Sequence, residues 1–286
     1  MSKPRTIFLT SLFVLTAAGW RVEAATSIEN DRYSVNLEAA DGTFTIATKP
    51  DGKTVLKAGK LSGTGGTAKT VELTDKALGN GKGIEVTYAN GNREVVALYP
   101  GLPFVTFRST LHNGGAEAVV LNHIPTVSAA IDLGKPLAEI KTLGTGGLLA
   151  PAKNPGSYAF LTIVDPQTRS GVVGGWLTHD RGSGVVFSPV QEDAVRMQAQ
   201  IDYGRLRIKP GADATAEMFA IGYFDDARFG MEAYADAIAK IYAVKLPRQQ
   251  AGFCTWYMEK HAGGLRRGPS ARGQRGGRQG IETLWL

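Results

Sequence analysis

The chain has 286 residues, of which 43% are hydrophobic and 20% are charged. This composition excludes an intrinsically disordered protein, because disordered chains have too few apolar residues to build a core. The formal net charge is +6, a value that raises the question of an anionic partner such as nucleic acid.

The positive charge lies at the two ends of the chain. Residues 1–24 contribute +2, and residues 263–286, with five arginines and one glutamate, contribute +4, so residues 25–262 have no net charge. A protein that binds phosphates needs cations clustered on its folded surface. We therefore expect no nucleic-acid partner.

The first 24 residues have the pattern of a secretory signal peptide. Lys3 and Arg5 precede an apolar run over 7–18, and small residues follow at positions 22 and 24. The run is shorter than the roughly 20 residues that span a bilayer, which makes an N-terminal anchor the weaker alternative. We expect a signal peptide over 1–24, a mature start near Ala25, a secreted or periplasmic location and no other membrane association.

From residue 33 the sequence alternates apolar and polar residues, which is typical of strands with one buried face. Asp41-Gly42, Pro50-Asp51-Gly52 and Asn90-Gly91 separate such segments and predict turns. Many short strands without intervening helices predict a large antiparallel β-sandwich over 25–224. The expected strands cover 33–37, 43–48, 70–74, 83–88, 93–99, 104–111, 118–124, 158–164, 171–177, 184–187, 194–203 and 216–221.

Two glycine-rich segments interrupt this pattern. Residues 134–157 show no clear period, so we interpret them as a long loop. Their Gly144-Thr-Gly146-Gly147 run is not expected to bind phosphate, because no helix follows it. In the second segment, 174–184, Trp176 is expected in the core and Asp180-Arg181-Gly182 at a hairpin tip.

Histidines often act in catalysis or bind metals, but the spacing of the histidines in this sequence does not support either role. Adjacent residues of a strand point to opposite faces, so His179 and Asp180 are not expected to act as a dyad. His112 and His123 lack the spacing of metal ligands and are expected to be surface or satisfied core residues. The sequence predicts no metal site.

A helical period replaces the alternation after residue 224. Asp225 or Asp226 can cap a helix whose apolar residues recur until Pro247. We expect a linker helix over 225–247 that packs on a neighbouring domain. The apolar positions of this helix are Met231, Tyr234, Ala235, Ile238, Ile241 and Tyr242.

A short apolar and aromatic segment, Gly252-Phe-Cys-Thr-Trp-Tyr257, follows this helix. It predicts one buried strand within 248–262. Together with the sandwich, the helix and the proline, it resembles the N-terminal half of melibiase-like glycoside hydrolases, the α-galactosidase and raffinose-synthase group. The resemblance covers residues 28–261, and its specific part is the hexapeptide.

This resemblance implies that the hexapeptide is the first strand of a catalytic (β/α)₈ barrel. Members of the family use two aspartates on later barrel strands to hydrolyse α-galactosides with retention, without a metal or organic cofactor. Retention requires two carboxylates about 5–5.5 Å apart. A barrel needs about 250 residues, whereas 35 remain from Gly252, so no residue here inherits a catalytic role and we expect this chain to be inactive.

Residues 263–286 change abruptly in composition, being rich in glycine and arginine. We expect a disordered tail that arises from a frameshift or truncation near 261–264. The alternative is a genuine nucleic-acid-binding tail, since Gly/Arg segments can bind single strands.

Two residues of the hexapeptide are candidates for chemistry. The resemblance places Trp256 nearest the sugar subsite, where an aromatic face suits a pyranose, and a position in the barrel core is an equal alternative. Cys254 is the one cysteine of the sequence, so no intrachain disulfide is possible. On a buried strand we expect it to be inert.

The resemblance therefore implies a secreted glycoside hydrolase related to α-galactosidases, with carbohydrate as its partner. The alternative from another class is a non-catalytic carbohydrate-binding or adhesive β-sandwich.

Overall fold

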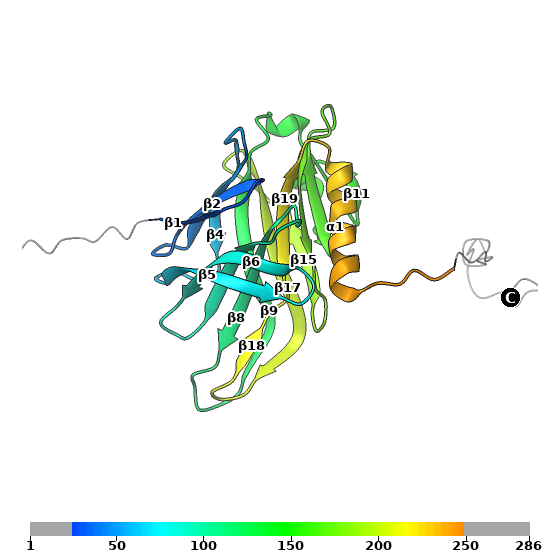
Figure 1. Ribbon diagram of the computed structural model, residues 1–286. Coiled ribbons are helices and arrows are strands. Elements are labelled where there is room, and N and C mark those ends of the chain that lie inside the picture. The colour runs from blue at the N-terminus through cyan, green and yellow to red at the C-terminus, as the bar shows by residue number, and fades with distance from the viewer. Residues whose placement is uncertain (1–24, 249–286) are drawn as a thin grey trace, which may run out of the picture. The chain divides into compact units, whose positions relative to one another are not determined.

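The computed structural model describes residues 25–248. These residues form two antiparallel sheets packed as a sandwich, followed by one helix that lies along the side of the sandwich (Figure 1). The prediction of a mostly β fold with a large antiparallel sandwich is confirmed. The expected barrel strand, the signal peptide and the tail lie outside the described residues.

Sheet A has nine strands, in the order β1-β2-β3-β4-β9-β17-β15-β12 with β16 beside β17. Its strands are β1 (Thr26–Glu29), β2 (Tyr33–Glu38), β3 (Thr43–Thr48), β4 (Thr54–Leu61), β9 (Val119–Ile131), β12 (Ser157–Tyr158), β15 (Ser183–Phe187), β16 (Val190–Gln191) and β17 (Ala194–Ile208).

Sheet B has ten strands, in the order β11-β10-β13-β14-β19-β8-β7-β6-β5 with β18 beside β8. Its strands are β5 (Thr67–Asp75), β6 (Gly79–Thr87), β7 (Arg93–Leu98), β8 (Val105–His112), β10 (Lys141–Gly144), β11 (Gly147–Leu149), β13 (Phe160–Val164), β14 (Gly171–Trp176), β18 (Asp213–Thr215) and β19 (Phe219–Phe224).

Alternating side chains of both sheets build the main core. In β2 the buried residues are Tyr33, Val35 and Leu37, as expected for a strand with one buried face. Across the sandwich, the rings of Phe44 from sheet A and Phe107 from sheet B lie 5.2 Å apart. The period-two pattern in the sequence therefore marks the residues that hold the two sheets together.

Helix α1 (Ala227–Tyr242) covers the outer face of sheet B, where it contacts β14 and β19. The hydroxyl of Tyr234 donates to the carbonyl of Trp176 at 2.7 Å. A Cβ on Gly175 would lie 2.5 Å from the Tyr234 ring, so this glycine lets the helix approach the strand closely. The apolar face of the helix packs on the sandwich, and its role as a linker to a further domain stays a prediction.

Residues 134–157 are not the continuous loop that the sequence predicted. They contain the hairpin β10–β11, which extends sheet B from β13, and two short 3₁₀ helices, Leu137–Glu139 and Pro151–Lys153. The Gly144–Gly147 run is the tight turn of this hairpin, with Gly147 at φ +89°. The two strands are short and half-exposed, so they lack the buried alternation that identifies a strand.

Some other strand predictions also need correction. Strand β9 continues through Pro125 to Ile131, because the proline lies beside an irregular step in the pairing with β17, where a missing N–H is tolerated. Strand β4 was not expected, and irregular pairing on both of its sides breaks its alternation. Helix α1 ends at Tyr242 rather than at 247.

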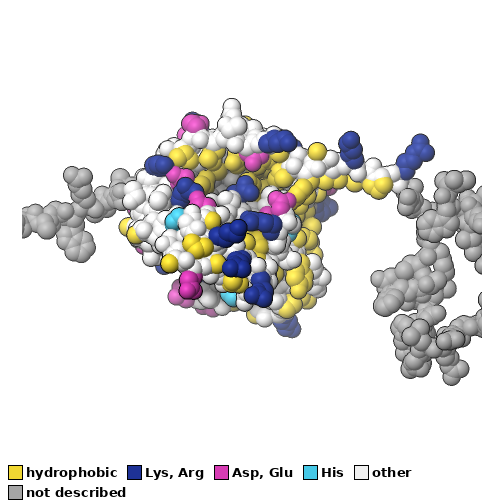
Figure 2. Space-filling model, turned by 90° about the horizontal axis from the view of Figure 1, so that it is seen from below, with side chains coloured by type: hydrophobic (Ala, Val, Ile, Leu, Met, Phe, Trp, Pro, Cys, Tyr) yellow, Lys and Arg dark blue, Asp and Glu magenta, His cyan; other side chains and the backbone are white. Residues whose placement is uncertain are grey.

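Charge is distributed unevenly over the sandwich. Figure 2 shows Lys and Arg side chains gathered over the middle of the lower face, with acidic and hydrophobic side chains around them. Since residues 25–262 have no net charge, acids elsewhere compensate for this group. In the described part of the chain, no helix has the length and hydropathy needed to cross a membrane.

Candidate functional site

The residues that the resemblance singled out, Trp256 and Cys254, lie outside residues 25–248. Their predicted roles stay predictions. The search for a site therefore turns to the sandwich and α1.

His179 and Asp180 lie in the loop after β14 and not on a strand, so the expectation that a strand turns them to opposite faces is wrong. Trp176 is fully buried, whereas His179 and Asp180 are exposed in the loop after β14 and contact the hydroxyl of Tyr242. His112 is held by a 2.7 Å contact from its Nδ1 to Asp213, and His123 is exposed. Among residues 25–248, no group of three or more His, Cys, Asp and Glu side chains could hold a metal ion.

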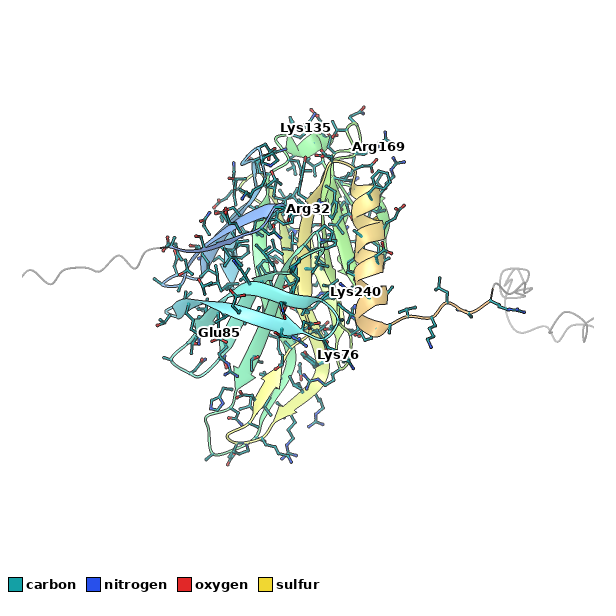
Figure 3. The ribbon with its side chains drawn as sticks, in the orientation of Figure 1. Arg32, Lys76, Glu85, Lys135, Arg169 and Lys240 are labelled. Atoms are coloured by element: carbon teal, nitrogen blue, oxygen red, sulfur yellow. The ribbon has the colours of Figure 1, made fainter. Side chains whose placement is uncertain are left out.

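A cleft of about 710 Å³ lies beside the first turns of α1, and we call it the α1 cleft. Four separate segments meet there: the start of β2, the turn between β3 and β4, the segment before β8, and the junction of β19 with α1. Figure 3 shows Arg32 at the end of β2 that faces the helix. The lining residues used below are Arg32, Tyr33, Lys49, Asp51, Pro103, Tyr223, Phe224, Asp225, Asp226 and Phe229.

Aromatic rings form much of the cleft. Phe229 on the first turn of α1 is 63% exposed. Phe224 lies beneath the guanidinium of Arg32, whose carbon is 5.6 Å from the ring centre. The cleft therefore offers one exposed ring and one ring held under a cation.

Tyr33 fixes the floor of the cleft. Its buried hydroxyl accepts a 2.9 Å hydrogen bond from the backbone N–H of Tyr223 and lies 3.2 Å from the carbonyl oxygens of Pro103 and Tyr223. Burial raises the pKa of this phenol, so it stays a neutral hydrogen-bonding group. One side chain thus joins three of the four segments.

Charged groups of both signs surround the rings. A hydrogen bond from Thr48 lowers the pKa of Asp51, and hydrogen bonds from Arg228 hold the pKa of Asp226 at about 2. Lys49 pairs with Glu29 at 3.1 Å. At neutral pH the cleft therefore carries ionised carboxylates and cations together.

This arrangement suits a polar ligand with one apolar face. An exposed ring can pack against that face, while carboxylates accept and guanidinium or ammonium groups donate hydrogen bonds to hydroxyl groups. The lining therefore supports the binding of such a ligand.

Sequence analysis missed this cleft, although it used Asp226 as a helix cap. Residues 32, 51, 103 and 225 are too far apart in the chain for any local pattern to connect them. Phe229 was the available signal, because an apolar residue there departs from the buried stripe of α1.

No family model matches the chain, and no curated protein matches its sequence. Solved structures with a distantly similar fold include β-sandwich domains of glycoside hydrolases. An α-galactosidase from Lactobacillus brevis is similar with a TM-score of 0.48 and 10% identity, over 76% of this chain and 41% of that protein. A glycoside hydrolase family 97 enzyme from a Pseudoalteromonas species, in complex with acarbose, has a TM-score of 0.49 and 10% identity, over 71% of this chain and 36% of that protein.

Similarity extends to proteins of other kinds. A TPR-domain containing protein from Parabacteroides distasonis has a TM-score of 0.49 and 12% identity, over 80% of this chain and 50% of that protein. A galactose mutarotase related enzyme from Lactobacillus acidophilus has a TM-score of 0.41 and 11% identity, over 70% of this chain and 97% of that protein. The chain spans half or less of the length of the TPR-domain containing protein and of the α-galactosidase. At these identities the likeness concerns the β-sandwich fold alone.

Proposed function

We propose that residues 25–248 are the carbohydrate-binding β-sandwich of a secreted or periplasmic protein related to the α-galactosidase group of glycoside hydrolases. The observation that carries the binding role is the α1 cleft, which combines the exposed ring of Phe229 with ionised carboxylates and cations. Sugars present both the apolar C–H face and the hydroxyl groups that such a lining recognises.

The relation to α-galactosidases rests on the hexapeptide at 252–257, and the location rests on the signal-like pattern of 1–24. In this proposal Trp256 faces a sugar subsite. Retaining hydrolysis would require the two aspartates that the family carries on later barrel strands. The sandwich itself binds carbohydrate without cleaving it.

The test is titration of the whole chain with melibiose, raffinose and maltotriose, followed by NMR or calorimetry. We expect weak binding that prefers the two α-galactosides. Phe229→Ala should weaken it roughly 2- to 10-fold, because aromatic packing contributes about 0.5–1.5 kcal/mol.

Tyr158→Ala is the matched control, since Tyr158 is another aromatic side chain, 67% exposed, outside the cleft. It should leave the affinity unchanged. If none of the three sugars binds, or if the two substitutions have equal effects, the proposal is wrong. Preference for maltotriose would retain carbohydrate binding and remove the α-galactoside assignment.

A further inference from the structure

The chain contains three Asn-Gly pairs, Asn80-Gly81, Asn90-Gly91 and Asn113-Gly114. An asparagine side chain can react with the backbone nitrogen of the next residue, and glycine hinders this reaction least because it has no side chain and a flexible backbone. The sequence gives the three pairs the same reactivity. The structure places them in three different settings.

Asn113 is protected by the hydrogen bonds of its side chain. Its NH₂ group donates to the carbonyl oxygens of Glu117 and Ile208 at 2.7 and 3.0 Å, and its Oδ1 accepts from the N–H of Gly115 at 3.1 Å. The residue is 5% exposed. Both amide hydrogens are engaged, so the side chain is not free to turn toward the nitrogen of Gly114.

Asn80 is protected by the sheet. It lies in β6, where Asn80 and Gly81 pair with Thr74 and Leu73 of β5, and its Oδ1 accepts from the hydroxyl of Thr74 at 3.1 Å. Gly81 is buried against the ring of Tyr99. The backbone of this pair therefore cannot rearrange without breaking the ladder between β5 and β6.

Asn90 lies at the tip of the hairpin between β6 and β7, where Ala89, Asn90 and Gly91 are all exposed. Its Oδ1 accepts from the N–H of Asn92 at 3.0 Å, whereas its NH₂ group has no hydrogen-bond partner within residues 25–248. The N–H of Gly91 donates to the carbonyl oxygen of Tyr88 at 2.9 Å, so the turn must open before this nitrogen can react. Exposed turns open at a far lower free energy than paired strands or buried residues.

We infer that Asn90 is a site of spontaneous deamidation and isoaspartate formation. In the opened turn, the backbone nitrogen of Gly91 loses its proton to water or hydroxide and attacks Cγ of Asn90. The new C–N bond closes a cyclic imide, while the bond from Cγ to the amide nitrogen breaks and this nitrogen takes up a proton and leaves as ammonia. Water then adds to either imide carbonyl and breaks the bond of that carbonyl to the imide nitrogen, which gives an aspartate or an isoaspartate at position 90.

The two products differ in their effect on the hairpin. An aspartate keeps an oxygen that can accept from the N–H of Asn92. An isoaspartate leads the main chain through the former side chain and lengthens it by one carbon, which disturbs the pairing of Thr87 with Arg93 beside the turn. Both products add a negative charge to the tip of the hairpin.

The test is incubation of the whole folded chain at mildly alkaline pH, followed by peptide mapping with mass spectrometry. The exchange of NH₂ for OH raises the mass of the peptide, and chromatography separates aspartate from isoaspartate. We expect Asn90 to react at least about tenfold faster than Asn80 or Asn113, because its turn opens most readily. In urea that unfolds the chain, the three sites should react at similar rates, because the structure no longer protects any of them.

Asn90→Gln is the control variant. Its longer side chain would have to close a larger ring, so the peptide that contains position 90 should stay unmodified. Asn90 lies outside the α1 cleft, so this variant should bind melibiose like the wild type. The inference and the proposed function can therefore fail independently.

Three results would overturn the inference. The first is modification of Asn80 or Asn113 in the folded chain at a rate equal to that of Asn90. The second is an unmodified Asn90 in the folded chain after a time in which the unfolded chain reacts completely, since the turn would then stay closed. The third is an unchanged extent of modification in Asn90→Gln, which would place the reaction at another residue of the peptide.

Discussion

Individual buried polar residues connect segments that are remote in the sequence. Tyr33 joins β2 to the segments at residues 103 and 223 through its hydroxyl. Glu94 in β7 joins the loop after β4 to Tyr88, just after β6, and to Ser109 in β8 in the same way. Burial makes such residues sensitive to small chemical changes, because an unpaired polar atom in the interior is costly.

Glu94→Gln tests this sensitivity. The amide can accept at one oxygen, but its NH₂ group meets hydroxyl groups and N–H groups that currently donate, so we expect a loss of about 1–3 kcal/mol of unfolding free energy. Urea unfolding at pH 7 measures it.

The control is Glu85→Gln on the preceding strand, whose carboxylate pairs with Lys69 at 2.8 Å near the surface. Surface pairs contribute about 0–1 kcal/mol, so this variant should unfold almost like the wild type. If both variants lost a similar amount of unfolding free energy, the hydrogen bonds of Glu94 would not have the stabilising role proposed for them.

At the scale of one element, the stability of the first turn of α1 depends on its N-cap. Asp226 is the N-cap, and its side chain accepts from the backbone N–H of Arg228 at 3.0 Å. Hydrogen bonds and the charge of Arg228 hold the pKa of Asp226 at about 2. A folded pKa below the unfolded value of about 3.9 gives stability that is present above pH 4 and is lost as the pH falls toward 2.

We therefore expect the first turn of α1 to loosen between about pH 4 and pH 2, measured by amide exchange of residues 227–230. Asp226→Asn keeps a good cap without the titration, so its exchange should depend less on pH over that range. Asp226→Ala should exchange faster at all these pH values. An unchanged pH dependence in Asp226→Asn would show that another group controls this turn.

At the scale of the whole molecule, the sandwich and α1 bury several tyrosines. Burial raises the pKa of Tyr33 and Tyr234, and the pKa of Tyr88 rises through burial and the nearby Glu94 carboxylate. A raised folded pKa gives stability that is complete below the unfolded pKa of about 10 and is lost as the pH rises above it.

The unfolding free energy should accordingly fall from pH 10 upward, by at most about 1.4 kcal/mol per pH unit for each tyrosine. Tyr234→Phe removes one of these titrations and should give a smaller slope between pH 10 and pH 11.5. Tyr158→Phe, an exposed tyrosine, should keep the wild-type slope. Equal slopes in all three proteins would contradict the burial argument.

Local patterns in the sequence determined most of the sandwich by themselves. Alternation identified strands such as β2, because a strand with one buried face repeats every two residues. Asn90-Gly91 marked a hairpin turn in which Gly91 has φ +84°, and Asp226 marked the start of α1. These features depend on residues adjacent in the chain, which is why they can be read without the structure.

Tertiary structure alone decided where the elements meet. Strand β14 is buried on both faces, because sheet A covers one face and α1 covers the other. The residues of β14 alone do not indicate that a helix packs on it. The α1 cleft unites residues about 190 positions apart, such as Tyr33 and Tyr223. The hydrogen bond from the N–H of His112 to Oδ1 of Asn92 likewise joins residues 20 positions apart. Packing and hydrogen bonding over such separations have no local signature, so the sequence determined most of the strands and α1, whereas tertiary structure determined the α1 cleft.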